Sequence, residues 1–176
     1  MNDKPNKRKQ EILYVGRLVK AKHVDKALEA ATLLSLNEYT HFNVWGYGNE
    51  ETNLRKKYSD NQKFIFHGAI NHADVYKEYQ KNKVFISLNP AEPFGITYEE
   101  AIANGLYVVA SDTGGGVDFL KHYPDRCSLV DVNDVDSITK GLKLGLESNL
   151  RPLTDQELDE LSYSNTADQI FRVTKK

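Results

Sequence analysis

Cysteine and long apolar runs are the two features that this chain of 176 residues most clearly lacks. The single cysteine, Cys127, excludes an intramolecular disulfide and a metal site built from cysteines, so we expect an incidental or buried thiol. No stretch approaches the roughly 20 apolar residues that are needed to cross a bilayer. The sequence therefore predicts no membrane span.

An excess of charge of one sign is also absent. The chain has 23 lysines and arginines against 25 aspartates and glutamates, a net charge of −2, which excludes an overall basic field for nucleic acid. The first residues are polar and basic, but no apolar stretch follows them, so they do not form a signal peptide. We expect a cytoplasmic protein in which residues 1–10 are a linker and residues 11–176 form one domain.

Short runs rich in β-branched and aromatic residues alternate with longer segments of helical period. The runs predicted to be strands are Ile12–Val15, Phe42–Trp45, Phe64–Phe66, Val84–Leu88, Tyr107–Ala110 and Ser128–Val130. The predicted helices are residues 24–34, a polar segment through Leu54 and Tyr58, one from its cap Asn71 to Lys81, one that ends at Asn104-Gly105, Val135–Leu146 and Thr154–Phe171. This alternation predicts a single Rossmann-like α/β domain, with a doubly wound parallel sheet covered on both faces.

In such a sheet, ligands bind where the loops that follow the strands converge. Glycines and charged residues dominate these loops, which begin at Gly16-Arg17, Gly46-Tyr47-Gly48, His67-Gly68, Asn89 and Asp112. Glycine lets backbone N–H groups come close to a phosphate. The loops therefore favour a groove for a phosphate-bearing ligand.

Glu92 and Glu100 are separated by seven residues and flank the predicted start of a helix. With a rise of about 1.5 Å per residue, their carboxyl groups would lie on the order of 10 Å apart, too far to share a proton. Between them the N–H groups of Phe94, Gly95 and Ile96 are expected to be free at the positive end of the helix dipole. We interpret the two glutamates as hydroxyl ligands on either side of a diphosphate, and an ordinary loop charge with a solvated helix residue is the alternative.

Two patterns that suggest other chemistry have simpler explanations. Asp134-Val-Asp136 has the spacing of a metal-binding motif, but it precedes an amphipathic segment, so we expect a helix cap and no metal site. Gly46-Tyr47-Gly48 would need a third glycine for a dinucleotide fingerprint, and Glu51 stands there instead. The aromatic residues Trp45, Phe66 and Phe85 lie inside predicted strands and are expected in the core.

The block EPFGITYEEAIANG, residues 92–105, resembles the signature of glycosyltransferase family 4, a family of retaining enzymes with the GT-B fold. The resemblance extends from Ile12 to the C-terminal helix. Related family features fall at Gly16-Arg17-Leu18 with Lys22, at Gly46-Tyr47-Gly48, and at Gly114-Gly115 with Asp118. The resemblance implies the C-terminal, donor-binding domain of a GT-B enzyme.

By this resemblance, Glu92 would lie near the donor sugar, and the backbone of Phe94, Gly95 and Ile96 would hold the sugar and the β-phosphate. Glu100 would accept hydrogen bonds from the ribose hydroxyls. Apart from the resemblance, we interpret Gly46 and Gly48 as a tight turn under the nucleotide, and His67 as lying at the edge of the base. Gly16 is also expected to bind the nucleotide sugar. For these loop residues an ordinary structural role remains open.

The resemblance also implies that Arg17 and Lys22 neutralise the diphosphate as it leaves, which agrees with the need for fixed cations where charge develops. The family usually follows that lysine with glycine, whereas this chain has His23, a bulkier residue that could tilt the loop. Asp118 stands where the family more often has glutamate, and we assign it no role.

The function implied is transfer of a sugar from a UDP- or GDP-linked donor to a hydroxyl, with retention and without metal or cofactor, in polysaccharide or glycoconjugate biosynthesis. The acceptor-binding N-terminal domain is a further expected partner, without which this chain should be inactive. Peripheral membrane association of the full-length enzyme stays open. The alternatives are a non-catalytic nucleotide-sugar-binding or assembly module, and a sugar-nucleotide epimerase or phosphorylase with the same fold.

Overall fold

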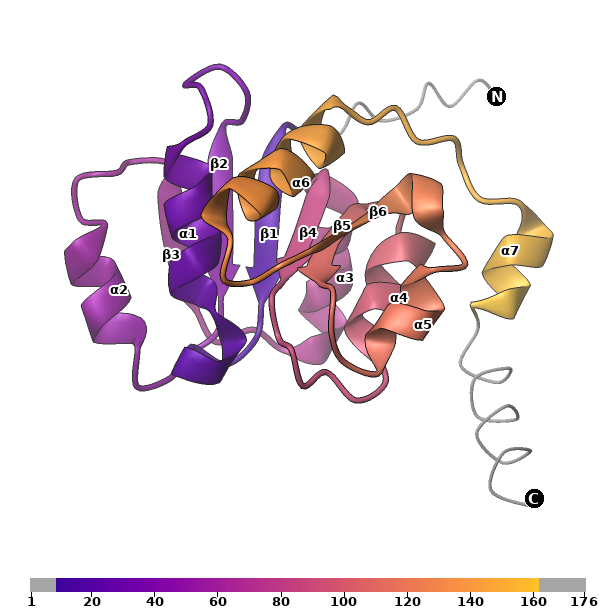
Figure 1. Ribbon diagram of the computed structural model, residues 1–176, viewed down its shortest axis with the longest axis horizontal. Helices are drawn as coiled ribbons and strands as arrows, with labels where there is room; N and C mark the ends of the chain where they lie inside the picture. Colours follow the sequence, from indigo (N-terminus) through magenta and orange to yellow (C-terminus); the bar gives the residue numbers. More distant parts are fainter. Residues whose placement is uncertain (1–8, 162–176) are drawn as a thin grey trace.

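The computed structural model describes residues 9–161, which form a six-stranded sheet in the order β3-β2-β1-β4-β5-β6 (Figure 1). All neighbouring strands pair in parallel. The strands are β1 (Glu11–Val15), β2 (His41–Trp45), β3 (Phe64–Gly68), β4 (Val84–Ser87), β5 (Tyr107–Ser111) and β6 (Cys127–Val130). The predicted doubly wound α/β fold is confirmed.

Helices cover both faces of the sheet. The helices are α1 (Val24–Thr32), α2 (Glu51–Lys57), α3 (His72–Lys81), α4 (Ile96–Ala103), α5 (Gly116–Leu120), α6 (Val135–Glu147) and α7 (Asp155–Glu160), with short 3-10 turns at Lys20–Lys22 and Pro124–Arg126. Helices α1 and α6 pack side by side on one face, while α3 and α4 lie behind the sheet in the same view (Figure 1). The core is accordingly split into two clusters, one on each side of the sheet.

The central strands explain why the sheet is parallel and enclosed. Every residue of β4 and of β5 is buried, and Val84 and Ile86 contribute to one cluster while Phe85 contributes to the other. Continuous apolar runs of this kind suit a sheet that is covered on both faces.

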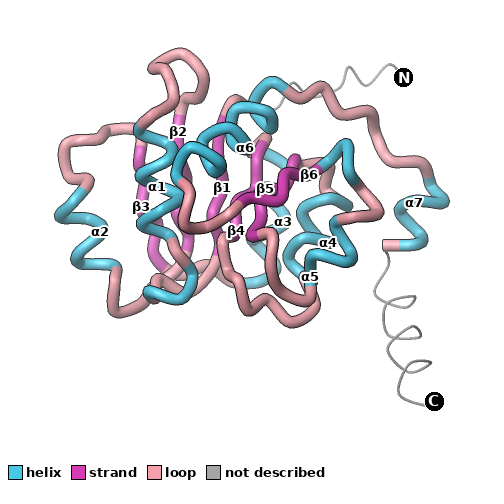
Figure 2. Tube along the Cα trace, in the orientation of Figure 1, coloured by secondary structure: helices cyan, strands magenta, loops and turns pink. Residues whose placement is uncertain are grey.

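The pairing between β1 and β4 is short. Strand β1 pairs with β2 along five residues, but with β4 it pairs only at Ile12 and Leu13. The chain changes direction across the sheet at this junction, because β2 and β3 lie on one side of β1 and β4 to β6 on the other. A crevice at the carboxyl ends of strands is typical of such a switch point. We call the edge formed by these ends and their loops the carboxyl edge, and Figure 2 shows the loops gathered there.

Three sequence predictions need correction. The segment after the Asp112–Gly116 loop includes the short helix α5, which we did not predict. Asn71 occupies the cap position of α3, but its side chain makes no capping hydrogen bond. Of the three aromatic residues expected in the core, Phe85 is fully buried, whereas Trp45 and Phe66 are only partly buried and pack against the two clusters from their edges.

Other predictions hold or fall outside the structure. Burial raises the pKa of the half-buried Cys127 thiol to about 11, which fits an unreactive side chain. The helix predicted over Thr154–Phe171 begins as α7, and its part beyond Leu161 lies outside the described residues, as does most of the predicted linker. Within residues 9–161, no helix is both long and apolar enough to cross a membrane.

Asp134 caps helix α6, as predicted. Its Oδ1 atom accepts hydrogen bonds from the backbone N–H groups of Asp136, at 3.0 Å, and Ser137, at 3.2 Å. These bonds satisfy two of the amide groups that a helix start leaves unpaired. The Asp-x-Asp spacing is thereby explained by local structure. No group of three or more His, Cys, Asp or Glu in the described part of the chain is arranged to hold a metal ion.

Replacing Asp134 should therefore affect folding. We expect Asp134→Ala to lower the free energy of unfolding by about 1 kcal/mol, because the cap is lost, and Asp134→Asn to change it far less, because asparagine caps equally well. Urea denaturation followed by circular dichroism measures both. Equal destabilisation by the two variants would contradict the capping role.

Candidate functional site

The loops after β1, β2 and β3 are joined by backbone contacts at the carboxyl edge. Gly16 N donates to Trp45 O at 3.0 Å, and Gly46 N donates to Gly68 O at 2.6 Å. A Cβ atom on Gly46 would lie only 1.8 Å from Gly16 O, so no other residue fits without moving the loop. The Gly16 and Gly46 loops thus form one surface, and Gly48, whose carbonyl accepts from Glu51 N, leads from it into α2. The binding of a nucleotide over this surface stays a prediction.

A second pair of loops meets on the other side of the switch point. Gly115 N donates to Glu92 O at 2.7 Å, and a Cβ atom on Gly115 would lie 2.0 Å from Pro93 O. The start of α4 also lies close to this loop, since a Cβ atom on Gly95 would lie 2.9 Å from Gly116 Cα. The glycine loop after β5 therefore fixes the backbone that carries Glu92.

The Glu92 carboxylate has two partners from different parts of the chain. Asn89 Nδ2 donates to Glu92 Oε2 at 3.0 Å, and Lys22 Nζ lies 3.8 Å from the same oxygen. The side chains of Lys22 and Glu92 are 25% and 17% exposed, and Asn89 is buried. The ion pair joins the loops that follow β1 and β4, so it places a cation and a carboxylate together at the carboxyl edge.

His23, directly after Lys22, has a left-handed backbone with φ 49° and ψ 36°. It is the one residue other than glycine with a positive φ among residues 9–161. This geometry explains why glycine suits the position, since left-handed backbone costs other residues roughly 1–2 kcal/mol. With His23 in this conformation, the Lys22 amine lies 3.8 Å from Glu92 Oε2, and whether His23 tilts the loop relative to a glycine stays a prediction.

Helix α4 begins at the carboxyl edge without a side-chain cap. Gly95 is its N-cap with φ 72°, and its carbonyl accepts from Tyr98 N and Glu99 N. Within the described residues, the N–H groups of Gly95, Ile96 and Thr97 make no backbone hydrogen bond. Phe94 is 62% exposed, so the segment before the helix faces solvent. Open N–H groups and the helix dipole together favour an anion here.

Glu100 lies in the second turn of α4, and both of its oxygens are bound from α3. Tyr79 OH donates to Oε2 at 3.2 Å, and His72 Nε2 lies 3.2 Å from Oε1. The Glu100 side chain is 9% exposed, so it is not the solvated helix residue of the alternative interpretation.

Arg17 projects from the loop after β1 and is exposed. Its carbonyl accepts a hydrogen bond from Tyr14 OH at 2.8 Å, which anchors the loop. Burial raises the pKa of the Tyr14 phenol, and the nearby Arg17 charge partly opposes the shift. The Arg17 guanidinium makes no hydrogen bond or ion pair with other described residues, so it is available to a ligand.

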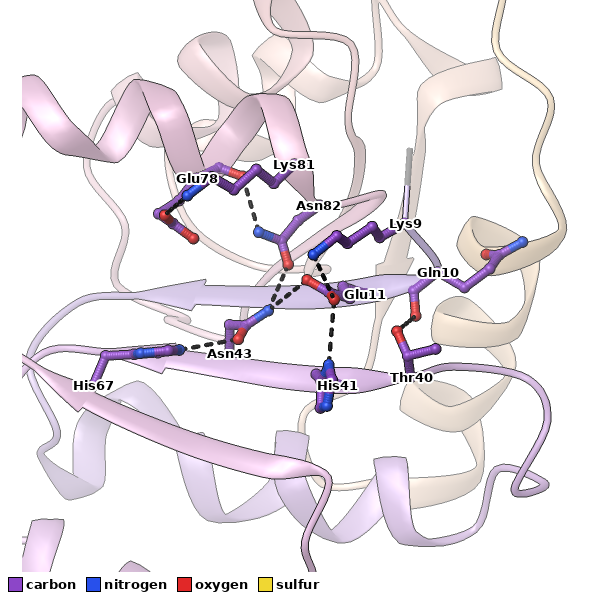
Figure 3. Close-up of polar contacts among 10 residues, drawn as sticks. All are labelled: Lys9, Gln10, Glu11, Thr40, His41, Asn43, His67, Glu78, Lys81 and Asn82. Carbon is purple, nitrogen blue, oxygen red and sulfur yellow. Dashed lines mark hydrogen bonds and ion pairs between the residues drawn. The ribbon is translucent and has the colours of Figure 1, made fainter. Parts of the chain in front are cut away.

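His67 lies next to the last residue of β3 and belongs to a polar network (Figure 3). Its Nε2 atom lies 3.0 Å from Asn43 Oδ1, and its ring stacks on Trp45 with centroids 4.2 Å apart. Asn43 in turn donates to Glu11 Oε2 at 3.1 Å and to Asn82 Oδ1 at 2.9 Å. Burial lowers the pKa of the His67 imidazole. The network holds the ring against the sheet, and the predicted contact with a base stays a prediction.

Sequence reasoning missed three residues that shape the site, namely Asn89, His72 and Tyr79. Asn89 lies three residues before Glu92, and this local spacing could have indicated a side-chain contact. No sequence signal pairs α3 with Glu100, because that contact joins different helices.

Comparisons with known proteins show the family of the chain. The family model described as "Glycosyl transferases group 1" matches residues 2–163. The chain is 30% identical over 107 residues to the GtfA subunit of a UDP-N-acetylglucosamine–peptide N-acetylglucosaminyltransferase from Streptococcus pneumoniae, covering 60% of the chain and 21% of the relative. An uncharacterized glycosyltransferase of Methanocaldococcus jannaschii is 30% identical over 163 residues, covering 91% of the chain and 40% of the relative.

The fold has solved counterparts. The apo form of the lipopolysaccharide outer core galactosyltransferase WaaB superposes with a TM-score of 0.75 at 18% identity, covering 95% of this chain and 50% of that one. At this identity the likeness shows the fold alone. The fold is that of the C-terminal domains of GT-B glycosyltransferases, and the chain spans only 21% and 40% of the two curated relatives.

The backbone of His23 provides a test of the loop that carries Lys22. We expect His23→Gly to raise the free energy of unfolding by about 1 kcal/mol, because glycine adopts the left-handed conformation without strain. His23→Val should lower it, because a β-branched residue is a true outlier there. Thermal unfolding of both variants measures the effects, and a destabilised His23→Gly variant would contradict the strain.

Proposed function

The chain belongs to the group 1 glycosyl transferases, and on that basis we propose that it binds the nucleotide-diphosphate sugar from which such an enzyme transfers the sugar to a hydroxyl. The observation that carries the proposal is the position of Glu92 and Glu100 on either side of the open start of α4, with Lys22 against Glu92. One elongated ligand with a sugar, a diphosphate and a ribose matches these groups in order.

The diphosphate would lie at the start of α4. Its negative charge would be offset by the free N–H groups of Gly95 and Ile96, by Lys22, and by Arg17 from the neighbouring loop. Such fixed positive groups stabilise a diphosphate as it leaves. They supply what a metal ion supplies elsewhere, so we propose a metal-independent reaction.

The sugar would lie beside Glu92. That carboxylate already binds Lys22 and Asn89, which suits a residue that orients sugar hydroxyls better than a nucleophile. Double displacement in retaining hydrolases uses two carboxyl groups only about 5 Å apart. The other carboxylate of the proposed site, Glu100, is instead held by His72 and Tyr79 of α3. We propose that the reaction retains the anomeric configuration without a covalent enzyme intermediate on Glu92.

The acceptor would be bound by another domain. The proposed ligand contacts all come from one edge of one sheet, from its loops and the first turns of α4, and the curated relatives are much longer than this chain. We propose an N-terminal domain opposite the carboxyl edge, which would present the acceptor hydroxyl and close the site against water. A cytoplasmic location and a role in polysaccharide or glycoconjugate synthesis stay predictions.

A panel of UDP- and GDP-linked sugars, screened by thermal shift with and without EDTA, tests the proposal. A ligand present at a hundred times its Kd should add about 2.7 kcal/mol of stability. At least one nucleotide sugar should raise Tm, and EDTA should not reduce the shift. No shift with any member of the panel would overturn the proposal, and a shift that EDTA abolishes would overturn metal independence.

The two glutamates should have separable effects on binding. Glu100→Ala should weaken the binding of the nucleoside diphosphate (UDP or GDP) and of the corresponding sugar nucleotide equally, because it removes ribose contacts. Glu92→Ala should weaken the binding of the sugar nucleotide more than that of the bare diphosphate. Each lost charge-assisted hydrogen bond should cost about 1.5–3 kcal/mol. Calorimetry with both ligands separates the effects. Equal losses for both ligands in both variants would show that the roles are assigned wrongly.

The chain alone should bind donor without transferring sugar. Holding two reactants in position lowers the barrier by roughly 7–11 kcal/mol, and this chain would hold only one of them. Incubation with its best-binding sugar nucleotide and a panel of sugar and lipid-linked acceptors, followed by mass spectrometry, tests this. The Glu92→Ala variant serves as the blank, and robust product from the unaltered chain would place the acceptor site within it.

A further inference from the structure

Glu100 is the only one of the proposed ligand-binding carboxylates that is anchored from a helix on its own face of the sheet. Its Oε2 atom accepts from Tyr79 OH at 3.2 Å, and its Oε1 atom lies 3.2 Å from His72 Nε2. Both partners belong to α3, in which they are separated by nearly two turns. The carboxylate is therefore held at two points, one for each oxygen.

The two contacts from α3 leave acceptor positions on the Glu100 carboxylate for a ligand. An ionised carboxylate has about four lone-pair positions, two on each oxygen. Tyr79 and His72 occupy one on each oxygen and leave one on each oxygen for a ligand. A ribose presents two neighbouring hydroxyls, at C2′ and C3′, and each can donate one hydrogen bond. The remaining positions of Glu100 match this pair in number.

We propose that Tyr79 and His72 are positioning residues that orient Glu100 for a ribose diol, and so make the site discriminate ribonucleotides from 2′-deoxyribonucleotides. This inference rests on the proposed nucleotide-sugar function. It adds the source of sugar-ring selectivity, which lies in α3 rather than in the loops of the carboxyl edge.

Tyr79 is the rigid anchor of the two. It is 1% exposed, and its ring packs edge-on against Phe85 with centroids 5.7 Å apart. Burial and the neighbouring Glu100 charge raise the pKa of the Tyr79 phenol, so it stays protonated and donates to Glu100. The torsion that rotates a carboxylate about its last bond is broad, and a fixed donor restricts it.

His72 is the accessible anchor. Its side chain is 71% exposed, and it lies at the first residue of α3, where its ring meets Tyr76 edge-on at 5.6 Å. An exposed contact contributes less than a buried one, because water competes for both partners. Loss of His72 should therefore reduce selectivity less than loss of Tyr79.

The test compares the affinity of a ribonucleoside diphosphate with that of its 2′-deoxy analogue. The full chain and the variants Tyr79→Phe and His72→Ala are titrated by calorimetry with UDP and 2′-deoxy-UDP, and with GDP and 2′-deoxy-GDP. The control is Tyr107→Phe, which also removes a hydroxyl with partly buried hydrogen bonds, to Cys127 O and Ser128 Oγ, but on the opposite face of the sheet. A general loss of stability would then appear in the control as well.

The ratio of ribo to 2′-deoxy affinity should fall about tenfold in Tyr79→Phe, equivalent to about 1.4 kcal/mol, and about threefold in His72→Ala. It should not change in Tyr107→Phe. In a Glu100→Ala background, Tyr79→Phe should cause no further fall, because the oriented group is already gone.

A ratio within twofold of the unaltered chain in either α3 variant would overturn the inference while leaving nucleotide binding intact. Because the His72 side chain is exposed, His72→Ala should fold, and it tests the inference even if Tyr79→Phe does not fold. If the unaltered chain binds none of the four nucleotides, the proposed function itself falls and the inference with it.

Discussion

Close approach of backbones at the carboxyl edge is the constraint on which the rest of this site depends. Gly115 donates to the carbonyl of Glu92 with no room for a side chain, and Gly46 meets Gly16 in the same way on the other side of the switch point. Because the backbone itself is fixed, the side chains that project from it need few contacts of their own. Arg17 can therefore remain exposed, without an ion pair to any residue between 9 and 161, and the start of α4 can remain without a side-chain cap. These groups are thereby left for a ligand.

The predictable part of the molecule is the part that local pattern determines. The apolar runs at β4 and β5 identified the central strands, because such runs have to be enclosed in a parallel sheet. Asp134 was identifiable as a cap because a cap depends on its own neighbours in sequence. The short helix α5 was not predicted, because it begins at the last glycine of the Gly114–Gly116 run and its five residues are too few to show a helical period.

The unpredicted part consists of contacts between distant segments. The order of the strands brings the loops after β1 and β4 together, and only this order puts Lys22 beside Glu92. Tyr79 and Glu100 meet because α3 and α4 pack on the same face of the sheet. The polar network around Asn43 joins three strands and the end of α3, and no single segment shows it (Figure 3). Spacing along the chain could place Glu92 and Glu100 relative to α4, but not the partners that come from other segments, which are Lys22, His72 and Tyr79.

The short pairing of β1 with β4 has a mechanical consequence. Two pairs of residues join the halves of the sheet at this seam, fewer than at any other strand junction of the sheet. A bound diphosphate would lie across this seam and contact both halves, as the Lys22–Glu92 pair already does. The ligand would then hold the two halves of the sheet together. Because local opening would be reduced, amide hydrogen exchange would slow even in strands that the ligand does not contact.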